Sequence, residues 1–105
     1  MFTTLSTMTI GLNYGAPAGD LKGTPVPLDV AMDNIKATMA HHGIDCFTVV
    51  ECKGYWMGEP EASLRIEVLH NDGHKDVVEA ARWLKVALMQ EAVLVTKQEL
   101  QGDLV

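Results

Sequence analysis

The pattern of apolar and polar residues along the chain predicts six elements. Strict alternation predicts strands at residues 4–13 and 62–70. Apolar positions at helical spacing predict helices at residues 28–42 and 74–89. Residues 44–56 and 92–96 carry apolar residues at both odd and even positions, so they are predicted to be strands that are covered on both faces. The resulting order is β-α-β-β-α-β.

This order of elements predicts an α+β fold. Two split β-α-β units form one four-stranded antiparallel sheet with both helices on the same face, the ferredoxin-like arrangement. A chain of 105 residues has room for one hydrophobic core. Residues 1–105 are therefore expected to form a single domain, in which residues 98–105 are a polar tail. Many unrelated functions use this fold, so the fold alone does not decide the function.

The strand predicted at residues 44–56 indicates how the chain assembles. Its apolar residues fall on both faces, with Cys46, Val50 and Cys52 on one face and Phe47 and Val49 on the other. Two helices can cover only one face of the sheet, so the second face is expected to be buried against another copy of the chain. The sequence therefore predicts a homo-oligomer.

Composition and charge narrow the possible partners. A net charge of -6 opposes nucleic-acid binding, which usually requires a basic face, and mildly favours a cationic small ligand. No apolar run approaches the ~20 residues that cross a bilayer, and the N-terminus lacks the basic flank of a signal peptide, so we expect a cytoplasmic protein without membrane contact. His70 and His74 flank a turn, but no further ligand set of recognisable spacing accompanies them. Neither a metal nor a cofactor is predicted.

Candidate binding groups are concentrated between the second and third strands. Residues 54–61 hold two glycines, a proline, two aromatic residues and two carboxylates, a combination that a turn does not require. Loops held by a rigid sheet are where binding groups tend to lie. Gly11, inside the first strand, marks either a close approach of another group or a simple bulge. Residues 15–27 form a long connection rich in glycine and proline, a candidate lid over an adjacent site.

Three features, in a fixed order, carry a resemblance to a known family. The second strand ends in Gly54-Tyr55 and is followed by Glu61, the second helix contains Ala81-Arg82, and residues 90–97 read Gln-Glu-Ala-Val-Leu-Val-Thr-Lys. Together these features resemble the small S-adenosylmethionine (SAM) hydrolases and SAM lyases of bacteriophages. In that family the segment that matches residues 90–97 reads Gln-acid-x-Val-Leu-Val-x-Lys. The similarity covers roughly residues 35–97, and the N-terminal loop matches poorly.

The resemblance implies a PII-like trimer with a substrate pocket between neighbouring subunits, near the ends of the first and second strands. It implies that Glu61 is the important carboxylate and that SAM is the substrate. A lyase would yield methylthioadenosine and L-homoserine lactone, whereas a hydrolase would yield homoserine. The implied role is phage counter-defence in the host cytoplasm, where SAM depletion starves methylation and SAM-dependent restriction.

The chemical groups of SAM assign roles to the residues around Glu61. In a lyase, Glu61 would orient the ammonium group or balance the sulfonium charge, and in a hydrolase it would activate water. Tyr55 or Trp56 would stack on adenine or lie over the sulfonium as a cation–π partner, although Trp56 would equally fill an oligomer interface. Glu59 is either a second ligand group or a solvated turn carboxylate.

Three further residues are candidate substrate contacts. Thr9 and Asn13 offer hydrogen bonds from the first strand, and Gln90 either contacts the substrate or fixes the junction between the second helix and the fourth strand. Two other functions stay open at this point. One is a non-catalytic PII-like trimer that binds or sequesters an adenine-containing molecule. The other is an interaction protein whose exposed sheet face docks a partner.

Overall fold

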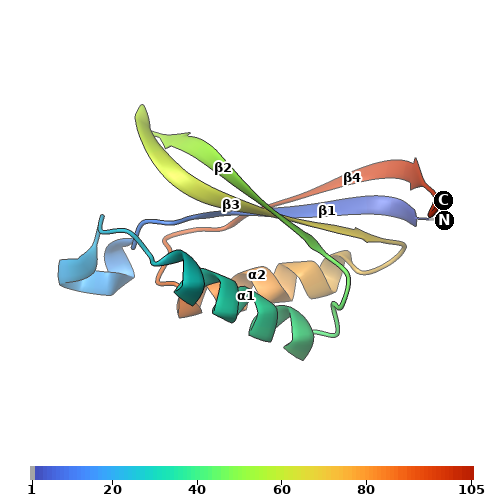
Figure 1. The fold of residues 1–105 in the computed structure, drawn as a ribbon, viewed down its shortest axis with the longest axis horizontal. Helices are drawn as coiled ribbons and strands as arrows, with labels where there is room; N and C mark the ends of the chain where they lie inside the picture. The colour runs from blue at the N-terminus through green and yellow to red at the C-terminus, as the bar shows by residue number, and fades with distance from the viewer. Residues whose placement is uncertain (1) are drawn as a thin grey trace.

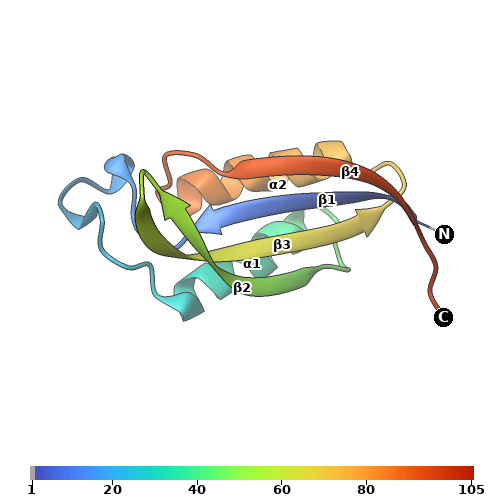
Figure 2. The same ribbon diagram turned by 90° about the horizontal axis from the view of Figure 1, so that it is seen from above.

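A computed structural model describes residues 2–105, which form a four-stranded antiparallel sheet with two helices on one face (Figure 1). The strand order is β2-β3-β1-β4, as Figure 2 shows from above. This arrangement confirms the predicted α+β, ferredoxin-like fold. The predicted domain also includes residue 1, which lies outside the described residues. The elements in chain order are β1 (Phe2–Gly11), the 3-10 helix η1 (Ala16–Leu21), α1 (Leu28–His41), β2 (Thr48–Trp56), β3 (Glu59–His70), α2 (His74–Ala87) and β4 (Leu94–Gly102).

The hydrophobic core lies between the two helices and one face of the sheet. Each fully buried apolar side chain contributes roughly 1.5–3 kcal/mol to the stability of the fold. The apolar stripe of each helix therefore determines which side of the helix packs against the sheet. Gly43, at a φ of 71°, follows the end of α1, as its position in the sequence predicted. The fully buried core side chains from strands and helices include Met8, Ile10, Leu64, Ile66, Ile35, Met39, Val77 and Leu84.

The hairpin between β2 and β3 extends beyond the end of β1 and curves away from the helices (Figures 1 and 2). Met57 and Gly58 form its turn, with φ angles of 52° and 81°. Positive φ at both central residues is the geometry of a type I′ turn, which matches the twist of antiparallel strands. Pairing therefore begins at once, with Trp56 opposite Glu59. For this reason β3 begins at Glu59, three residues before the predicted start.

The other strand boundaries also differ from the prediction. β1 covers residues 2–11 rather than 4–13, and β2 begins at Thr48 rather than at residue 44. The largest difference is in β4, which continues to Gly102 although residues 98–105 were predicted to be a tail. Gln98 pairs with Leu5 at the start of β1, and the ladder continues past a bulge to Gly102. A polar edge strand keeps one side in water, so polarity alone did not distinguish this strand from a tail.

The connection at residues 15–27 is folded back on itself and fixed to the end of the sheet. The N–H of Tyr14 donates to the carbonyl of Thr24 at 2.9 Å, which closes the base of the loop. The N–H of Gly15 donates to the carbonyl of Met89 at 2.8 Å, which ties the loop to the segment after α2. The connection is thus ordered and contains η1 (Ala16–Leu21), and its role as a lid stays a prediction.

The sheet face that points away from the helices, here called the outer face, carries apolar side chains. Both helices lie on the other side of the sheet (Figure 1). Leu69 and Leu94 are 45% and 63% exposed on this face. Leu5 lies opposite Leu69 on this face, and Val50 lies on it opposite Arg65.

Of the helices in residues 2–105, none combines the length and the apolar character that crossing a membrane requires.

Candidate functional site

The Glu61 carboxylate lies over the main chain of Gly11, at the end of β1. Gly11 pairs with Ser63 in an uninterrupted register, and Glu61 precedes Ser63 by two residues in β3, so Glu61 lies on the same outer face. A Cβ atom on Gly11 would overlap Oε1 of Glu61 and would lie 2.8 Å from its Cδ. Gly11 therefore marks the close approach of a carboxylate and not a bulge.

Two neighbouring segments hold this carboxylate in place. The main-chain N–H of Asn13 donates to Oε1 of Glu61 at 3.4 Å. Nε2 of Gln90, a residue that is only 5% exposed, donates to the carbonyl oxygens of Asn13 at 2.9 Å and of Leu88 at 3.0 Å. The structure thus brings together three predicted site residues, Glu61, Asn13 and Gln90, from three separate parts of the chain.

The bonds of Gln90 match one of the two roles considered for it. Its amide nitrogen is occupied by main-chain carbonyls, which matches a residue that fixes the junction between α2 and β4. Its Oε1 faces the same spot as the Glu61 carboxylate, 3.4 Å from the position of a Cβ on Gly11. A substrate contact through this oxygen stays a prediction.

The two aromatic candidates point to opposite faces of the hairpin. Tyr55 and Trp56 are 70% and 69% exposed at the end of β2. Trp56 pairs with Glu59, and Gly54 pairs with Glu61, so Trp56, Glu59 and Glu61 share the outer face. Tyr55 lies on the other face. The register therefore brings Trp56, and not Tyr55, to the same side as Glu61 within one chain.

Thr9 and Ser63 also belong to the outer face near Glu61. Thr9 lies between Arg65 of β3 and Leu94 of β4, two residues before Gly11. Ser63 is 5% exposed, and its hydroxyl donates to the carbonyl of Glu61 at 3.3 Å. Ser63 was not among the predicted site residues. Its position opposite a glycine on β1 is a signal that only the strand register reveals.

A second polar cluster lies towards the opposite end of the sheet. The buried hydroxyl of Ser6 lies 2.6 Å from Nε2 of His70 and 2.8 Å from Nδ1 of His74. The N–H of Gly73 donates to Nδ1 of His70 at 2.8 Å, so neutral His70 carries its proton on Nε2. Burial, followed by the nearby His74, lowers the pKa of His70. Nowhere in residues 2–105 do three or more His, Cys, Asp or Glu side chains gather to hold a metal ion.

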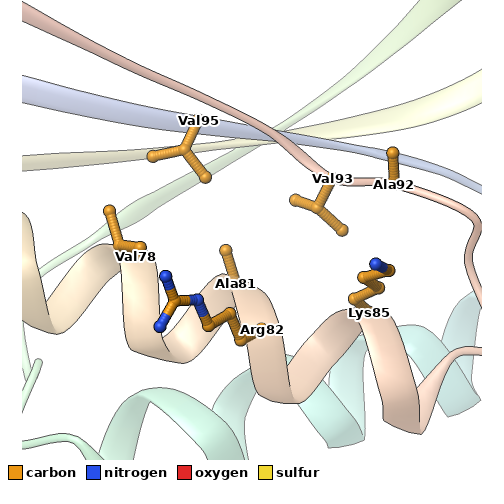
Figure 3. A pocket seen from close by; sticks show the side chains of 7 residues that line it. All are labelled: Val78, Ala81, Arg82, Lys85, Ala92, Val93 and Val95. Atoms are coloured by element: carbon orange, nitrogen blue, oxygen red, sulfur yellow. The ribbon is translucent and has the colours of Figure 1, made fainter.

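Two shallow hollows lie away from Glu61. One, of about 250 Å³, lies between α2 and the segment that leads into β4. Figure 3 shows Arg82 and Lys85 of α2 at this hollow, across from Val93 and Val95. The other, of about 280 Å³, includes His70 in its lining. Glu61 lines neither hollow, and its side chain is partly exposed.

Comparisons with known proteins define the class of the fold first. No protein-family model and no curated protein sequence matches this chain. Among solved structures, the chain is similar to CPII, a nitrogen regulatory PII-like protein from Thiomonas intermedia K12 that was solved with ADP, AMP and bicarbonate. The TM-score is 0.52 at 15% identity, and the match covers 100% of both chains. The fold is therefore PII-like.

A more specific similarity connects the chain to a phage SAM lyase. The apo structure of that enzyme matches with a TM-score of 0.66 and 25% identity, over 93% of this chain and 81% of the lyase chain. A phage SAM lyase in complex with S-methyl-5′-thioadenosine matches with a TM-score of 0.61 and 24% identity, over 92% of this chain and 81% of the lyase chain. This similarity confirms the resemblance found over roughly residues 35–97, and extends it over most of the chain.

Proposed function

We propose that this protein is a SAM lyase, which cleaves SAM to methylthioadenosine and L-homoserine lactone. The observation that carries the proposal is the Glu61 carboxylate, held over Gly11 at the end of β1 in a chain similar to a phage SAM lyase. The related structure with S-methyl-5′-thioadenosine supports the proposal because that molecule is a product of the proposed reaction.

The proposed reaction needs no group from outside the substrate. A carboxylate oxygen of SAM forms a bond to Cγ while the Cγ–S bond breaks, and the bonding electron pair moves to sulfur. Methylthioadenosine leaves as a neutral thioether, and the ammonium group stays on the lactone. Opposite charges cancel along this path, so a site that excludes water favours it. Holding the carboxylate and Cγ in near-attack geometry supplies several kcal/mol.

Glu61 supplies a fixed negative charge in this proposal. The Asn13 N–H orients the carboxylate, so Glu61 presents a defined position to the ammonium or the sulfonium of SAM. In the hydrolase version of the reaction, Glu61 would instead accept a proton from an attacking water molecule. The lyase reaction requires less from the protein than hydrolysis does, because the protein only has to position SAM and supply a negative charge.

The proposed substrate contacts surround this carboxylate. Trp56 and Glu59 share its face of the hairpin, so we assign Trp56 to the adenine or the sulfonium and Glu59 to a second ligand contact. Thr9 and Asn13 offer hydrogen bonds from β1 and the segment that follows it. Tyr55, on the other face, is assigned to a site that a neighbouring subunit completes.

We further propose that the chain is a single-domain subunit of a homotrimer, with substrate sites between subunits. The exposed apolar side chains Leu69 and Leu94 on the outer face support this assembly. The Glu61 side chain is only partly buried within one chain, which supports a site completed by a second copy. The proposed setting is the host cytoplasm, where depletion of SAM would counter methylation and SAM-dependent restriction.

The test is incubation of the purified protein with SAM in H₂¹⁸O, followed by mass spectrometry of the products. The proposal predicts methylthioadenosine and unlabelled homoserine lactone at the earliest time points. Homoserine that contains ¹⁸O from the first time point would indicate attack by water. Unchanged SAM would contradict both reactions. Saturable binding of SAM without turnover would then indicate the non-catalytic binding protein, and no binding would indicate the interaction protein.

A further inference from the structure

We propose that Gly11 is a positioning residue for the reaction and that it acts through Glu61. Because Gly11 has no side chain, the Glu61 carboxylate lies against β1, where the N–H of Asn13 donates to it. The importance of this position for SAM cleavage rests on the function proposed above. The position itself is a property of the folded chain and is measurable without substrate.

The atoms around Gly11 indicate that it is required for the site and not for the fold. A Cβ atom there would meet Oε1 and Cδ of Glu61, at the end of a flexible side chain, and next Oε1 of Gln90 at 3.4 Å, an ordinary contact distance. Gly11 lies in regular β1 pairing and its φ is not positive, so alanine fits the strand backbone. An alanine would therefore displace the carboxylate and leave the strand intact.

Gly15 shows the opposite case, four residues further along the chain. A Cβ atom on Gly15 would lie 2.8 Å from the main-chain nitrogen of Glu91 and 3.0 Å from the carbonyl oxygen of Met89. Main-chain atoms cannot rotate away, so alanine at this position would strain the attachment of the loop. The two glycines thus predict different outcomes for the same substitution, loss of activity at Gly11 and loss of stability at Gly15.

The displacement of the carboxylate has a measurable consequence for catalysis. The added methyl group would occupy the space that Oε1 of Glu61 fills, so the carboxylate would move away from the Asn13 N–H. A misplacement of about 1 Å costs roughly 100-fold in rate when a reaction depends on near-attack geometry. We therefore expect Gly11→Ala to lower kcat about 100-fold, while KM changes less.

The first experiment compares Gly11→Ala with wild type for SAM turnover and thermal stability. The matched control is Gly102→Ala in β4, where the nearest atom to an added Cβ is Cδ1 of Leu100 at 3.5 Å, an ordinary contact. The proposal predicts a wild-type Tm for both variants, with loss of turnover only in Gly11→Ala. A Gly11→Ala protein that unfolds would contradict the proposal, as would one that retains full activity.

The second experiment is an NMR titration that needs no substrate. In the wild-type protein, the Asn13 amide resonance should follow the ionisation of Glu61, because the two groups share a hydrogen bond. The response should disappear in Glu61→Gln and in Gly11→Ala. Its absence from the wild type, or its persistence in Gly11→Ala, would overturn the proposal. If wild type leaves SAM intact, the proposed function fails, and this titration still decides whether Gly11 positions Glu61.

Discussion

The Glu61 carboxylate takes its position from the main chain of a neighbouring strand. Its contacts are the Gly11 backbone and the Asn13 N–H, and within residues 2–105 no cationic side chain forms an ion pair with it. A carboxylate whose charge is not neutralised by the protein is available to a cationic ligand. SAM carries two positive groups, a sulfonium and an ammonium, so this arrangement matches the proposed substrate.

Gln90 should contribute to stability as well as to the shape of the site. Its amide donates to the carbonyl oxygens of Asn13 and Leu88, and Gln90→Leu leaves both without this donor. Leaving a buried polar group unsatisfied costs about 1–3 kcal/mol. We expect urea denaturation to show a free energy of unfolding lowered by roughly this amount. A Gln90→Leu protein as stable as wild type would show that the amide does not hold this junction.

His70 should make stability depend on pH. Its folded pKa lies below the ordinary value of 6.5, because burial, and then His74, disfavour the charged imidazolium. Below pH 6.5 the unfolded chain therefore binds more protons than the folded chain, and stability falls as the pH drops from 6.5 towards the lower folded pKa. Above that window this contribution is constant.

The measurement for His70 is a series of urea denaturation curves between pH 5 and 8, for wild type and for His70→Gln. The variant removes this titrating group, so its free energy of unfolding should fall less steeply with decreasing pH. Charged groups around His70 that also influence its pKa are His74, Asp72 and Lys97, and both proteins contain them. Identical pH profiles would contradict the assignment.

The strand β4 shows how an element gains stability beyond its apolar segment. Its polar second half pairs with the first residues of β1, with Glu99 opposite Thr4 and Gly102 opposite Phe2. Each main-chain hydrogen bond of such a ladder contributes about 0.5–1.5 kcal/mol net. The stability of this end of the sheet therefore depends on residues whose side chains are mostly exposed.

Deletion of residues 99–105 should destabilise the protein by about 1–3 kcal/mol, because it removes the last pairs between β1 and β4. The control is deletion of residues 103–105, which follow the end of β4 and should have almost no effect. Thermal denaturation of the two truncated proteins distinguishes these outcomes. Equal melting temperatures for both would show that the polar half of β4 contributes nothing.

The helices and the strands differed in how well the sequence predicted them. The predicted helices at 28–42 and 74–89 match α1 (Leu28–His41) and α2 (His74–Ala87) within two residues, because an apolar stripe determines a helix locally and Gly43 ends α1. The ends of β2, β3 and β4 were misplaced because they depend on pairing partners far away in the sequence. Alternation predicts that a strand exists, and it does not predict where pairing stops.

The candidate site was predicted only in part for the same reason. The resemblance indicated Glu61, and the glycine inside β1 indicated that some group approaches closely. That these two observations concern the same contact follows from the register of Gly11 against Ser63, 52 residues apart in sequence. Sequence patterns determine the face on which each side chain lies, whereas the register determines which side chains meet.

The outer face of the sheet determines how copies of the chain can associate. The two helices bury one face, and the other presents apolar side chains together with Arg65, whose Nε lies 3.7 Å from Oε2 of Glu67. Exposed apolar side chains gathered on one face are typical of an association surface. If subunits meet there, the Glu61 carboxylate lies at the edge of the contact, and assembly and activity should be lost together.

Leu94→Lys should dissociate the proposed trimer. Leu94 is 63% exposed on the outer face, and a lysine there would place an unpaired charge in the interface. The control is Val86→Lys, which adds the same charge at a 77% exposed position of α2. Sedimentation velocity should show monomers for Leu94→Lys and wild-type assembly for Val86→Lys, and turnover of SAM should fall at least ~10-fold only in Leu94→Lys.

A Leu94→Lys protein that retains both the wild-type mass and full turnover would show that the outer face is not the contact surface. A wild-type protein that sediments as a monomer and still cleaves SAM would contradict the shared site. In that case every group that the reaction requires would lie within one chain.

The central claim is that SAM cleavage depends on the Glu61 carboxylate, and the most direct test is a time course of methylthioadenosine formation by wild type and Glu61→Gln. The substitution keeps the size of the side chain and removes its charge, so the fold and the assembly state should be unchanged. Because loss of one electrostatic stabiliser typically costs about 100–1,000-fold in rate, we predict a decrease of at least that size. Formation of methylthioadenosine at the wild-type rate by Glu61→Gln would contradict the account.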